Sequence, residues 1–291
     1  MMPRMRFGFV LKRGKPEAGQ LAIDLIARLR SWGCEAALTE EDQASSGISV
    51  PGALIVPASE LGVSVDAVVV LGGDGTFLHA AGLVADHGVP LLGINLGTLG
   101  FMTHWSAAEA VEVLNAAAMQ TLGIDERMRL AVTVSENGVA TFQRNAINEA
   151  AITHRAMARL LELDAESDGA HIASYKADGV IVASPTGSTA YSLAAGGPIL
   201  TPQLEAMVLT PICPHTLTYR PVVLRADRGL IVRNVSSHHV SLTVDGQWNR
   251  ELAPGAHIEV SKAAKPLRLY RPSSAFFAVL RQKLRWGERQ A

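Results

Sequence analysis

Cysteines, aromatic residues and long apolar runs are all scarce in this chain of 291 residues. Its two cysteines, Cys34 and Cys213, lie far apart in the sequence and offer neither a zinc-binding spacing nor a disulfide framework. We expect both to be small buried residues of a protein that works in a reducing compartment, the cytoplasm. No stretch approaches the ~18 apolar residues that a membrane span needs, and the apolar part of residues 1–11 is too short for a signal peptide.

A strongly basic segment is also absent. The formal net charge is −1 and Lys and Arg form no block, so we do not expect a nucleic-acid partner, because such proteins usually carry a Lys- and Arg-rich stripe. A small polyanion needs only a few local cations, which this composition permits. With 48% hydrophobic and 18% charged residues, the chain can bury large cores, and its length favours two domains.

The first 125 residues alternate apolar strands with amphipathic helices. This pattern predicts a Rossmann-like α/β domain with a parallel sheet over residues 1–125. Its expected strands are 7–11, 35–38, 67–71 and 89–95, and its expected helices are 17–32, ended by Gly33, and 107–119.

From residue 126 the sequence changes to short strands separated by turn residues. Residues 126–270 therefore predict a β-rich, sandwich-like domain, with hairpin signals at Asn137-Gly138 and Asp168-Gly169. Its expected strands are 128–135, 139–146, 160–165, 171–175, 179–183, 207–210, 222–224, 230–233, 240–244 and 258–261. Residues 271–291 show helical spacing, and we expect this segment to pack back on the first domain.

The segment Gly72-Gly73-Asp74-Gly75-Thr76 follows an apolar strand and precedes a helix-like stretch that contains His79. Glycines let backbone N–H groups approach an anion closely, and the start of a helix favours negative charge. Asp74 would then stand among phosphates, where it could hold a metal or accept a proton from an attacking hydroxyl. The loop lacks the lysine of a Walker A sequence, and a plain tight turn is the alternative interpretation. The combination indicates phosphoryl transfer.

Three further segments suggest a nucleotide site. Residues 93–101 do not have the Rossmann glycine spacing, but their glycines and Phe101 would suit a planar base, a glycine turn being the alternative. Asn148-Glu149 joins an amide that donates or accepts to a carboxylate that only accepts, which suits ribose hydroxyls, although a surface polar pair is the simpler interpretation.

The third segment, residues 178–198, leads from Asp178 through an apolar strand into a hydroxyl-rich loop. Its Thr186, Ser188 and Thr189 are candidate helix N-caps, but their density beside Tyr191 favours a ligand pocket. The loop is not a G-x-S-x-G nucleophile elbow. The histidines supply no metal-binding spacing, so the metal ligands are unknown.

Taken together, these segments resemble the NAD kinase family over nearly the whole chain. The matching segments are 72–76 (the GGDG signature), 95–101 (the second glycine motif), 148–149 (the NE motif), 178–198, 210–217, 244–247 and 276–286. GGDG alone also occurs in diacylglycerol and sphingosine kinases and in phosphofructokinases, whereas the ordered set is specific.

The resemblance implies an α/β domain, a β-rich domain that binds NAD, and a cytoplasmic homodimer or homotetramer. The implied reaction transfers the γ-phosphoryl group of ATP to the 2′-hydroxyl of the adenosine ribose of NAD, giving NADP, with a divalent metal, usually Mg²⁺. Asp74 would be the general base, a metal ligand or both. Whether polyphosphate replaces ATP, whether NADH is also used and whether NADP(H) regulates the enzyme stay open.

The resemblance also implies the contact residues. Gly72, Gly73, Gly75 and Thr76 would form the phosphate loop. The implied NAD-binding residues are Asp74, Gly75, His79, Phe101, Asn148, Glu149, Arg159, Lys176, Asp178, Thr189, Ala190, Tyr191, Ser192, Leu193, Ala194 and Gln247. Family members that favour NAD over NADH often have Arg where this chain has Lys176, and Lys lacks the planar fork of Arg.

Two other functions share part of this pattern. A GGDG-type lipid kinase would also combine the glycine loop with a β-rich domain, but the hydroxyl-rich segment and Asn148-Glu149 argue against a lipid substrate. A non-catalytic dinucleotide sensor would retain the binding segments, but the presence of Asp74 argues against it.

Overall fold

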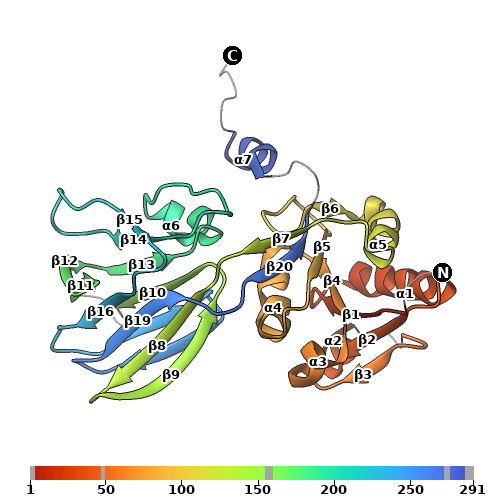
Figure 1. Cartoon of the computed structure of the whole chain (residues 1–291), viewed down its shortest axis with the longest axis horizontal. Helices are drawn as coiled ribbons and strands as arrows, with labels where there is room; N and C mark the ends of the chain where they lie inside the picture. The colour runs from red at the N-terminus through yellow and green to blue at the C-terminus, as the bar shows by residue number, and fades with distance from the viewer. Residues whose placement is uncertain (1–3, 47–49, 155–159, 272–275, 286–291) are drawn as a thin grey trace. The chain divides into compact units, whose positions relative to one another are not determined.

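The computed structural model describes residues 4–46, 50–154, 160–271 and 276–285, and the chain divides into two compact units (Figure 1). Unit 1 comprises Met1–Glu126 and Leu267–Ala291, and unit 2 comprises Arg127–Pro266. The sequence analysis placed residues 267–270 in the second domain. In the structure they form a strand of the unit 1 sheet, because they pair with a central strand of that sheet.

Unit 1 contains an eight-stranded sheet with the order β3-β2-β1-β4-β5-β20-β7, to which β6 adds by pairing with β5. Its strands are β1 (Arg6–Leu11), β2 (Glu35–Thr39), β3 (Leu54–Val56), β4 (Ala67–Gly72), β5 (Leu91–Asn95), β6 (Trp105–Ser106), β7 (Ile124–Arg127) and β20 (Leu267–Tyr270). Its α-helices are α1 (Pro16–Ser31), α2 (Glu40–Ser46), α3 (Leu61–Ser64), α4 (Asp74–Val84), α5 (Ala110–Ala118) and α7 (Phe276–Leu284). The strand order 3-2-1-4-5 and the parallel pairing confirm the predicted Rossmann-like fold.

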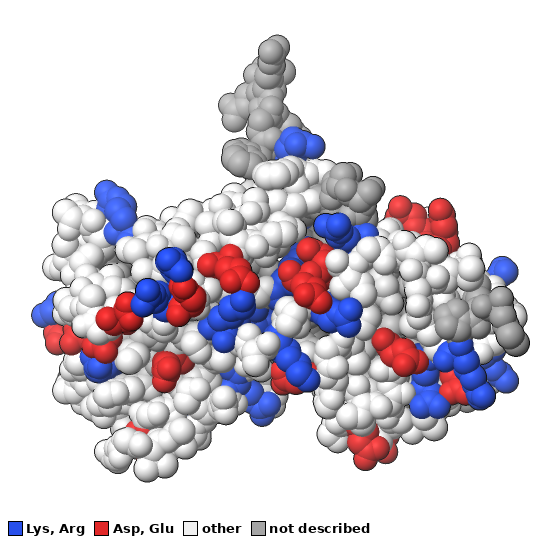
Figure 2. Space-filling model, in the orientation of Figure 1, with Lys and Arg blue, Asp and Glu red and all other residues white. Residues whose placement is uncertain are grey.

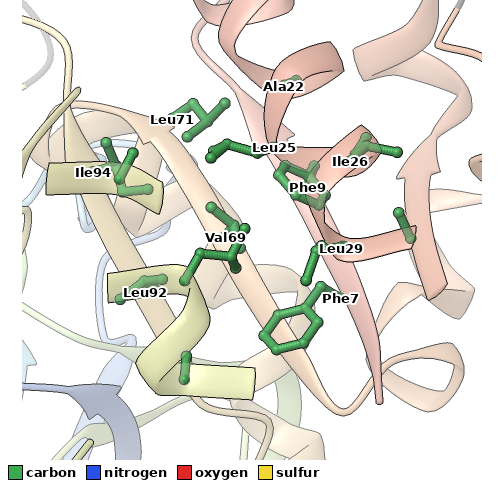
Figure 3. Close-up of a cluster of buried hydrophobic side chains, with 14 of the residues drawn as sticks. Phe7, Phe9, Ala22, Leu25, Ile26, Leu29, Val69, Leu71, Leu92 and Ile94 are labelled. Atoms are coloured by element: carbon green, nitrogen blue, oxygen red, sulfur yellow. The ribbon is translucent and has the colours of Figure 1, made fainter. Parts of the chain in front are cut away.

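Helices cover both faces of this sheet because its central strands are apolar on both sides. Phe7 and Phe9 of β1 point toward α1, where they meet Leu25 and Leu29 (Figure 3). The alternate residue Gly8 faces α3, since a Cβ built on it would lie 3.1 Å from Leu61. Helix α1 begins with Pro16 at its first turn and ends before Gly33, whose φ of +83° is left-handed.

Unit 2 consists of two six-stranded sheets with the orders β15-β14-β13-β10-β17-β18 and β12-β11-β16-β19-β8-β9, in which every described pairing is antiparallel. The first sheet contains β10 (Glu149–His154), β13 (Gly179–Ala183), β14 (Ala206–Ile212), β15 (Val222–Arg225), β17 (Val240–Val244) and β18 (Trp248–Leu252). The second contains β8 (Leu130–Glu136), β9 (Val139–Ala146), β11 (Leu161–Ser167), β12 (Ala170–Ala177), β16 (Leu230–Asn234) and β19 (His257–Lys262). The short helix α6 (Tyr191–Ala194) follows a 3₁₀ turn, η4 (Gly187–Thr189).

One apolar core joins these two sheets, so the sandwich-like prediction is confirmed. Val132 and Ile258 of one sheet belong to the same buried cluster as Ile152 and Val182 of the other. Both predicted hairpins form. Asn137 and Gly138 have φ angles of +52° and +76°, and Asp168 and Gly169 have +53° and +74°, as two-residue turns with both central φ angles positive require.

Two expectations from sequence were wrong. Cys34 is buried as expected, but Cys213 is exposed and lies just after the end of β14, with a left-handed φ of +43°. Strand β10 was missed although it is central in its sheet, since its sequence shows no strand-like alternation of apolar and polar residues.

The surface carries charges of both signs. On the face drawn in Figure 2, Lys and Arg side chains are interspersed with Asp and Glu, in keeping with the net charge of −1. Among the described residues, no helix is both long enough and apolar enough to cross a membrane.

Candidate active site

Asp74 lies where β4 ends and α4 begins, at the carboxyl edge of the unit 1 sheet. Its Oδ2 accepts the backbone N–H of Phe101 at 2.9 Å, and its Oδ1 accepts that of Met102 at 3.0 Å. The hydroxyl of Thr103 lies 3.3 Å from Oδ1. The carboxylate also stands in the first turn of α4, where the helix dipole favours negative charge. The structure therefore fixes the carboxylate and brings together Asp74 and Phe101, which the sequence analysis selected separately.

Asn95 shapes the second glycine segment around this carboxylate. Its side-chain amide donates to the carbonyl of Thr98 at 2.7 Å and to the hydroxyl of Thr103 at 2.9 Å, and its Oδ1 accepts the N–H of Gly97 at 2.6 Å. Gly100 belongs here because a Cβ would lie 2.1 Å from Asp74 Oδ1. This role of Asn95 was not predicted, although an Asn at the end of a strand is a known loop-forming signal.

The first glycine segment leaves open space beside Asp74. A Cβ on Gly73 or Gly75 would meet no atom within 4 Å, whereas a Cβ on Gly72 would lie 2.5 Å from the hydroxyl of Thr76. Gly72 is thus required by packing alone. The protein fold gives no steric reason for glycine at positions 73 and 75, which suits close approach of a ligand to the backbone.

A buried carboxylate, Asp42, lies beneath the same edge of the sheet. It accepts the N–H of Leu11 at 2.9 Å and the hydroxyl of Thr39 at 2.7 Å. Burial raises its pKa, and the positive charges of His79 and Arg13 oppose that effect. His79, predicted to reach phosphate, is half-buried on α4 and lies close enough to Asp42 to influence it. Asp42 and His79 therefore lie near each other at this edge.

Asp245 organises a second group of candidate residues, which belongs to unit 2. It sits in the turn between β17 and β18 with a φ of +51°. Its carboxylate accepts three consecutive backbone N–H groups, those of Ile147 and Asn148 at 2.7 Å and that of Glu149 at 3.0 Å. Asp245 lies in a segment that resembles the family, but no local pattern in the sequence indicates this structural role.

The hydroxyl-rich loop joins this structure through Ser184. Its hydroxyl donates to the carbonyl of Ile147 at 2.5 Å, and its N–H donates to the carbonyl of Asn148 at 2.8 Å. Residues 147–149 are thereby held from both sides. The N-cap interpretation of this loop is wrong, because neither Thr186 nor Ala190, the N-cap residues of η4 and α6, makes a side-chain capping bond.

Three buried oxygens in this region lack a hydrogen-bond partner among the described residues. They are Asn148 Oδ1, Glu149 Oε2 and Thr186 Oγ1. Buried polar atoms are almost always paired in folded proteins, so unpaired ones require an explanation. A bound ligand with hydroxyl groups would satisfy all three. The chemistry of these atoms therefore fits the prediction that Asn148 and Glu149 recognise a ribose.

Burial also perturbs the carboxylates of this group, and it raises the pKa of both Glu149 and Asp245. Burial, and then the negative charge of nearby Asp245, raise the pKa of Glu149 from 4.5 to about 7, although the backbone N–H of Tyr191 donates to it and opposes the rise. Near neutral pH it is thus balanced between an acceptor and a hydrogen-bond donor. Perturbed acids of this kind are typical of functional sites.

The other predicted contact residues fall into two places. Six of them are partly or fully accessible to solvent: Thr189, Ala190, Tyr191, Leu193, Ala194 and Gln247. Gln247 follows Asp245 by two positions. Ser192 is fully buried, and its hydroxyl is 2.9 Å from that of Thr210. Lys176 forms a 2.9 Å ion pair with Glu162. Asp178 lies just before the start of β13, whereas Glu149 pairs with Ala183 at the end of that strand. Five extended residues separate Asp178 from Ala183 by about 17 Å. Arg159 lies outside the described residues.

No group of three or more His, Cys, Asp or Glu side chains within the described residues could hold a metal ion by itself.

Comparison with known proteins gives concordant matches. The family model of the ATP-NAD kinase N-terminal domain matches residues 56–121, and that of the ATP-NAD kinase C-terminal domain matches residues 147–272. The chain is 41% identical to the NAD kinase of Geobacter sulfurreducens, over 94% of this chain and 96% of that protein. It is 40% identical to the NAD kinase of Moorella thermoacetica, over 97% of this chain and 90% of that protein.

Solved structures match over nearly the whole chain. Yeast NADH kinase complexed with NADH has a TM-score of 0.92 and 26% identity, with 99% of this chain and 90% of that chain covered. An NAD kinase from Archaeoglobus fulgidus in complex with ATP has a TM-score of 0.74 and 26% identity, with 95% and 97% covered.

The raised pKa of Glu149 predicts a pH-dependent effect of Glu149→Gln on stability without ligand. Well below pH 4.5 the carboxyl of Glu149 is protonated in both the folded and the unfolded protein, so it does not lower the free energy of unfolding. As the pH rises from 4.5 toward 7, Glu149 loses its proton in the unfolded chain but keeps it in the folded protein. The unfolded chain is thereby favoured, and the free energy of unfolding falls. We expect the neutral Gln to restore up to about 3 kcal/mol of unfolding free energy at pH 8 and only about 1 kcal/mol at pH 5.

Urea unfolding at both pH values measures this difference. Glu259→Gln, at an exposed position of β19, is the matched control and should change little at either pH. Equal effects of Glu149→Gln at pH 5 and pH 8 would contradict the assignment.

Proposed function

The chain belongs to the ATP-NAD kinase family, and we propose that it transfers the γ-phosphoryl group of ATP to the 2′-hydroxyl of the adenosine ribose of NAD, giving NADP. The family resemblance predicted from the sequence is confirmed. The observation that carries the proposal is the Asp74 carboxylate, fixed by backbone amides next to glycines that leave ligand space. A fixed carboxylate there suits a reaction that needs a proton acceptor beside phosphates.

Asp74 is the proposed general base. A ribose hydroxyl is a poor nucleophile at neutral pH, so a positioned carboxylate that accepts its proton accelerates attack on the γ-phosphorus. The P–O bond to ADP breaks as the P–O bond to the ribose oxygen forms, and the hydroxyl proton passes to Asp74. The N–H groups of Phe101 and Met102 hold the carboxylate in place, which lowers the reorganisation needed during the reaction.

The donor phosphates are proposed to bind over Gly73 and Gly75, where the start of α4 offers backbone N–H groups and a favourable dipole. His79 adds a nearby ring nitrogen. Mg²⁺ would enter with ATP, because the described side chains offer no complete metal site of their own. When bound, it would neutralise phosphate charge, and Asp74 would be the carboxylate next to it. The Archaeoglobus NAD kinase structure in complex with ATP supports ATP as the donor.

The acceptor ribose is proposed to bind the unpaired oxygens of Asn148, Glu149 and Thr186. Phe101 would pack on the adenine. The remaining proposed contacts are Thr189, Ala190, Tyr191, Ser192, Leu193, Ala194 and Gln247, with Arg159, Lys176 and Asp178 assigned to distant parts of the dinucleotide. A cytoplasmic homodimer or homotetramer also remains our proposal from the family resemblance.

The lipid-kinase and sensor functions are not favoured. A lipid headgroup would not need three buried oxygens beside a hydroxyl-rich loop, and the similar proteins include named NAD kinases. A sensor would have no use for a carboxylate fixed beside a phosphate loop.

Incubation of the protein with ATP, Mg²⁺ and NAD, followed by quantification of NADP by mass spectrometry, tests the proposal. We expect NADP to accumulate with enzyme and time, and no phosphorylation of diacylglycerol or sphingosine vesicles. Lipid phosphorylation without NADP would establish the lipid kinase instead. NAD binding without turnover, measured by calorimetry, would establish the sensor. NADH and polyphosphate, substituted in parallel, determine substrate and donor preference.

Asp74→Asn should remain folded and lose turnover by roughly 10²–10⁴-fold or more, because an amide cannot accept the proton. Replacing one acceptor oxygen by NH₂ next to backbone donors should also lower stability by about 1–3 kcal/mol. Thermal unfolding and NADP formation measure the two effects separately. A folded variant with near-normal turnover would exclude Asp74 as the base.

Gly75→Ala separates ligand binding from folding. Since a Cβ at position 75 meets no protein atom, we expect a stability within about 1 kcal/mol of the parent, but at least about tenfold lower kcat/KM for ATP, equal to about 1.4 kcal/mol. Gly82→Ala, on the same helix with equally open space, is the control and should keep full activity. Equal activity of the two variants would place the phosphates elsewhere.

A further inference from the structure

The last helix of the chain brings a cation to Asp74. Lys283 Nζ lies 3.7 Å from Asp74 Oδ2 and 5.0 Å from the centre of the Phe101 ring. Both partners in the ion pair are partly shielded from water, with 32% of the Lys283 side chain and 28% of the Asp74 side chain exposed. The lysine therefore lies beside both the proposed base and the aromatic ring proposed to pack on the adenine.

The sequence of α7 explains this placement. Val279 and Leu280 are buried, with 2% and 0% exposure. Lys283 follows them at spacings of four and three residues, so it lies on the same face of the helix as these two apolar residues. Arg281 lies two residues before Lys283 and therefore points to a different side of the helix. Of these two cations, Lys283 is the one that reaches Asp74.

The four contacts of Asp74 differ in kind. Oδ1 receives the N–H of Met102 and the hydroxyl of Thr103, and Oδ2 receives the N–H of Phe101. At 3.7 Å, Lys283 is an ion-pair partner of Oδ2 rather than a hydrogen-bond donor to it. This leaves room on Oδ2 for one more hydrogen bond, the one that an attacking hydroxyl would donate.

A cation at this position solves a charge problem in the proposed reaction. The base and the incoming γ-phosphoryl group are both negative, and both must approach the same hydroxyl oxygen. Like charges so close together repel, most strongly where water is partly excluded. A neighbouring ammonium group offsets that repulsion throughout the reaction, provided that it keeps its own protons.

We propose that Lys283 is a positioning residue of phosphoryl transfer, which acts through Asp74 by orienting Oδ2 and offsetting the charge of the carboxylate. This inference rests on the proposed role of Asp74. The hydroxyl proton still passes to Asp74, ADP still leaves, and Lys283 stays protonated. Many phosphate sites have a lysine in the glycine loop itself. In this protein Lys283 of α7 supplies the cation.

Three variants test this role. Lys283→Met removes the charge but keeps the length of the side chain, and we expect kcat to fall at least tenfold while KM for NAD and ATP stays within threefold. Lys283→Arg should recover most of kcat. Arg281→Met removes a charge from the same helix away from Asp74 and should behave like the parent. All three should show the thermal unfolding temperature of the parent within a few degrees.

A double-mutant cycle with Asp74→Asn shows whether Lys283 acts through Asp74. We expect the loss in Lys283→Met/Asp74→Asn to be close to that of Asp74→Asn alone, because the cation has lost its partner. Additive losses, an unchanged or raised kcat in Lys283→Met, or a change in KM alone would overturn the proposal. If the parent protein itself makes no NADP, the proposed function fails, which these assays distinguish from a failure of Lys283.

Discussion

The hydrogen bonds from the N–H groups of Phe101 and Met102 to Asp74 tie the two glycine segments of unit 1 to each other. Without them, the segment after β4 and the segment after β5 would be independent loops on neighbouring strands. With them, a carboxylate at the start of α4 fixes the backbone on which Phe101 is mounted, and Gly100 has to be glycine. The spacing between the base, the aromatic ring and the open glycine backbone follows from this one set of contacts.

Unit 2 uses the same physical device for a different purpose. Asp245 accepts three consecutive amides and so holds Asn148 and Glu149 at the end of a buried strand. Its negative charge also helps to raise the pKa of Glu149, so the contact that orders the loop destabilises the ligand-free site. The result is a buried acid, Glu149, whose Oε2 has no partner among the described residues. A ligand hydroxyl that donates to this oxygen would complete the site.

The sequence predicted those parts of the fold that depend on local periodicity. The continuous apolar run of β4, the Gly33 stop of α1 and the turns Asn137-Gly138 and Asp168-Gly169 all act over a few residues, and they appear in the structure as predicted. Strand β10 was missed because its central place in the sheet depends on partners distant in the sequence, β13 and β17.

The candidate site residues show the same difference between local and long-range features. The motifs identified Asp74, Phe101 and Glu149, since each lies in a recognisable segment. They gave no sign of the contacts that hold these residues, because Asp245 lies 97 residues from Asn148 in the sequence and Thr103 lies 29 from Asp74. A pattern read along the chain carries no signal for a hydrogen bond over such a separation, and only the fold reveals it.

The charge balance at the glycine loop 72–76 depends on α7, near the C-terminal end of the sequence. The loop has no lysine of its own at Walker A spacing, so the positive charge near Asp74 has to come from elsewhere. Strand β20 returns the chain to the unit 1 sheet beside β5, and α7 follows it. Val279 and Leu280 anchor that helix with Lys283 facing the carboxylate. Because the cation is carried by a separate element, its position depends on the docking of α7. Any change that weakens this docking should therefore affect Asp74 without altering a single residue of the two glycine segments.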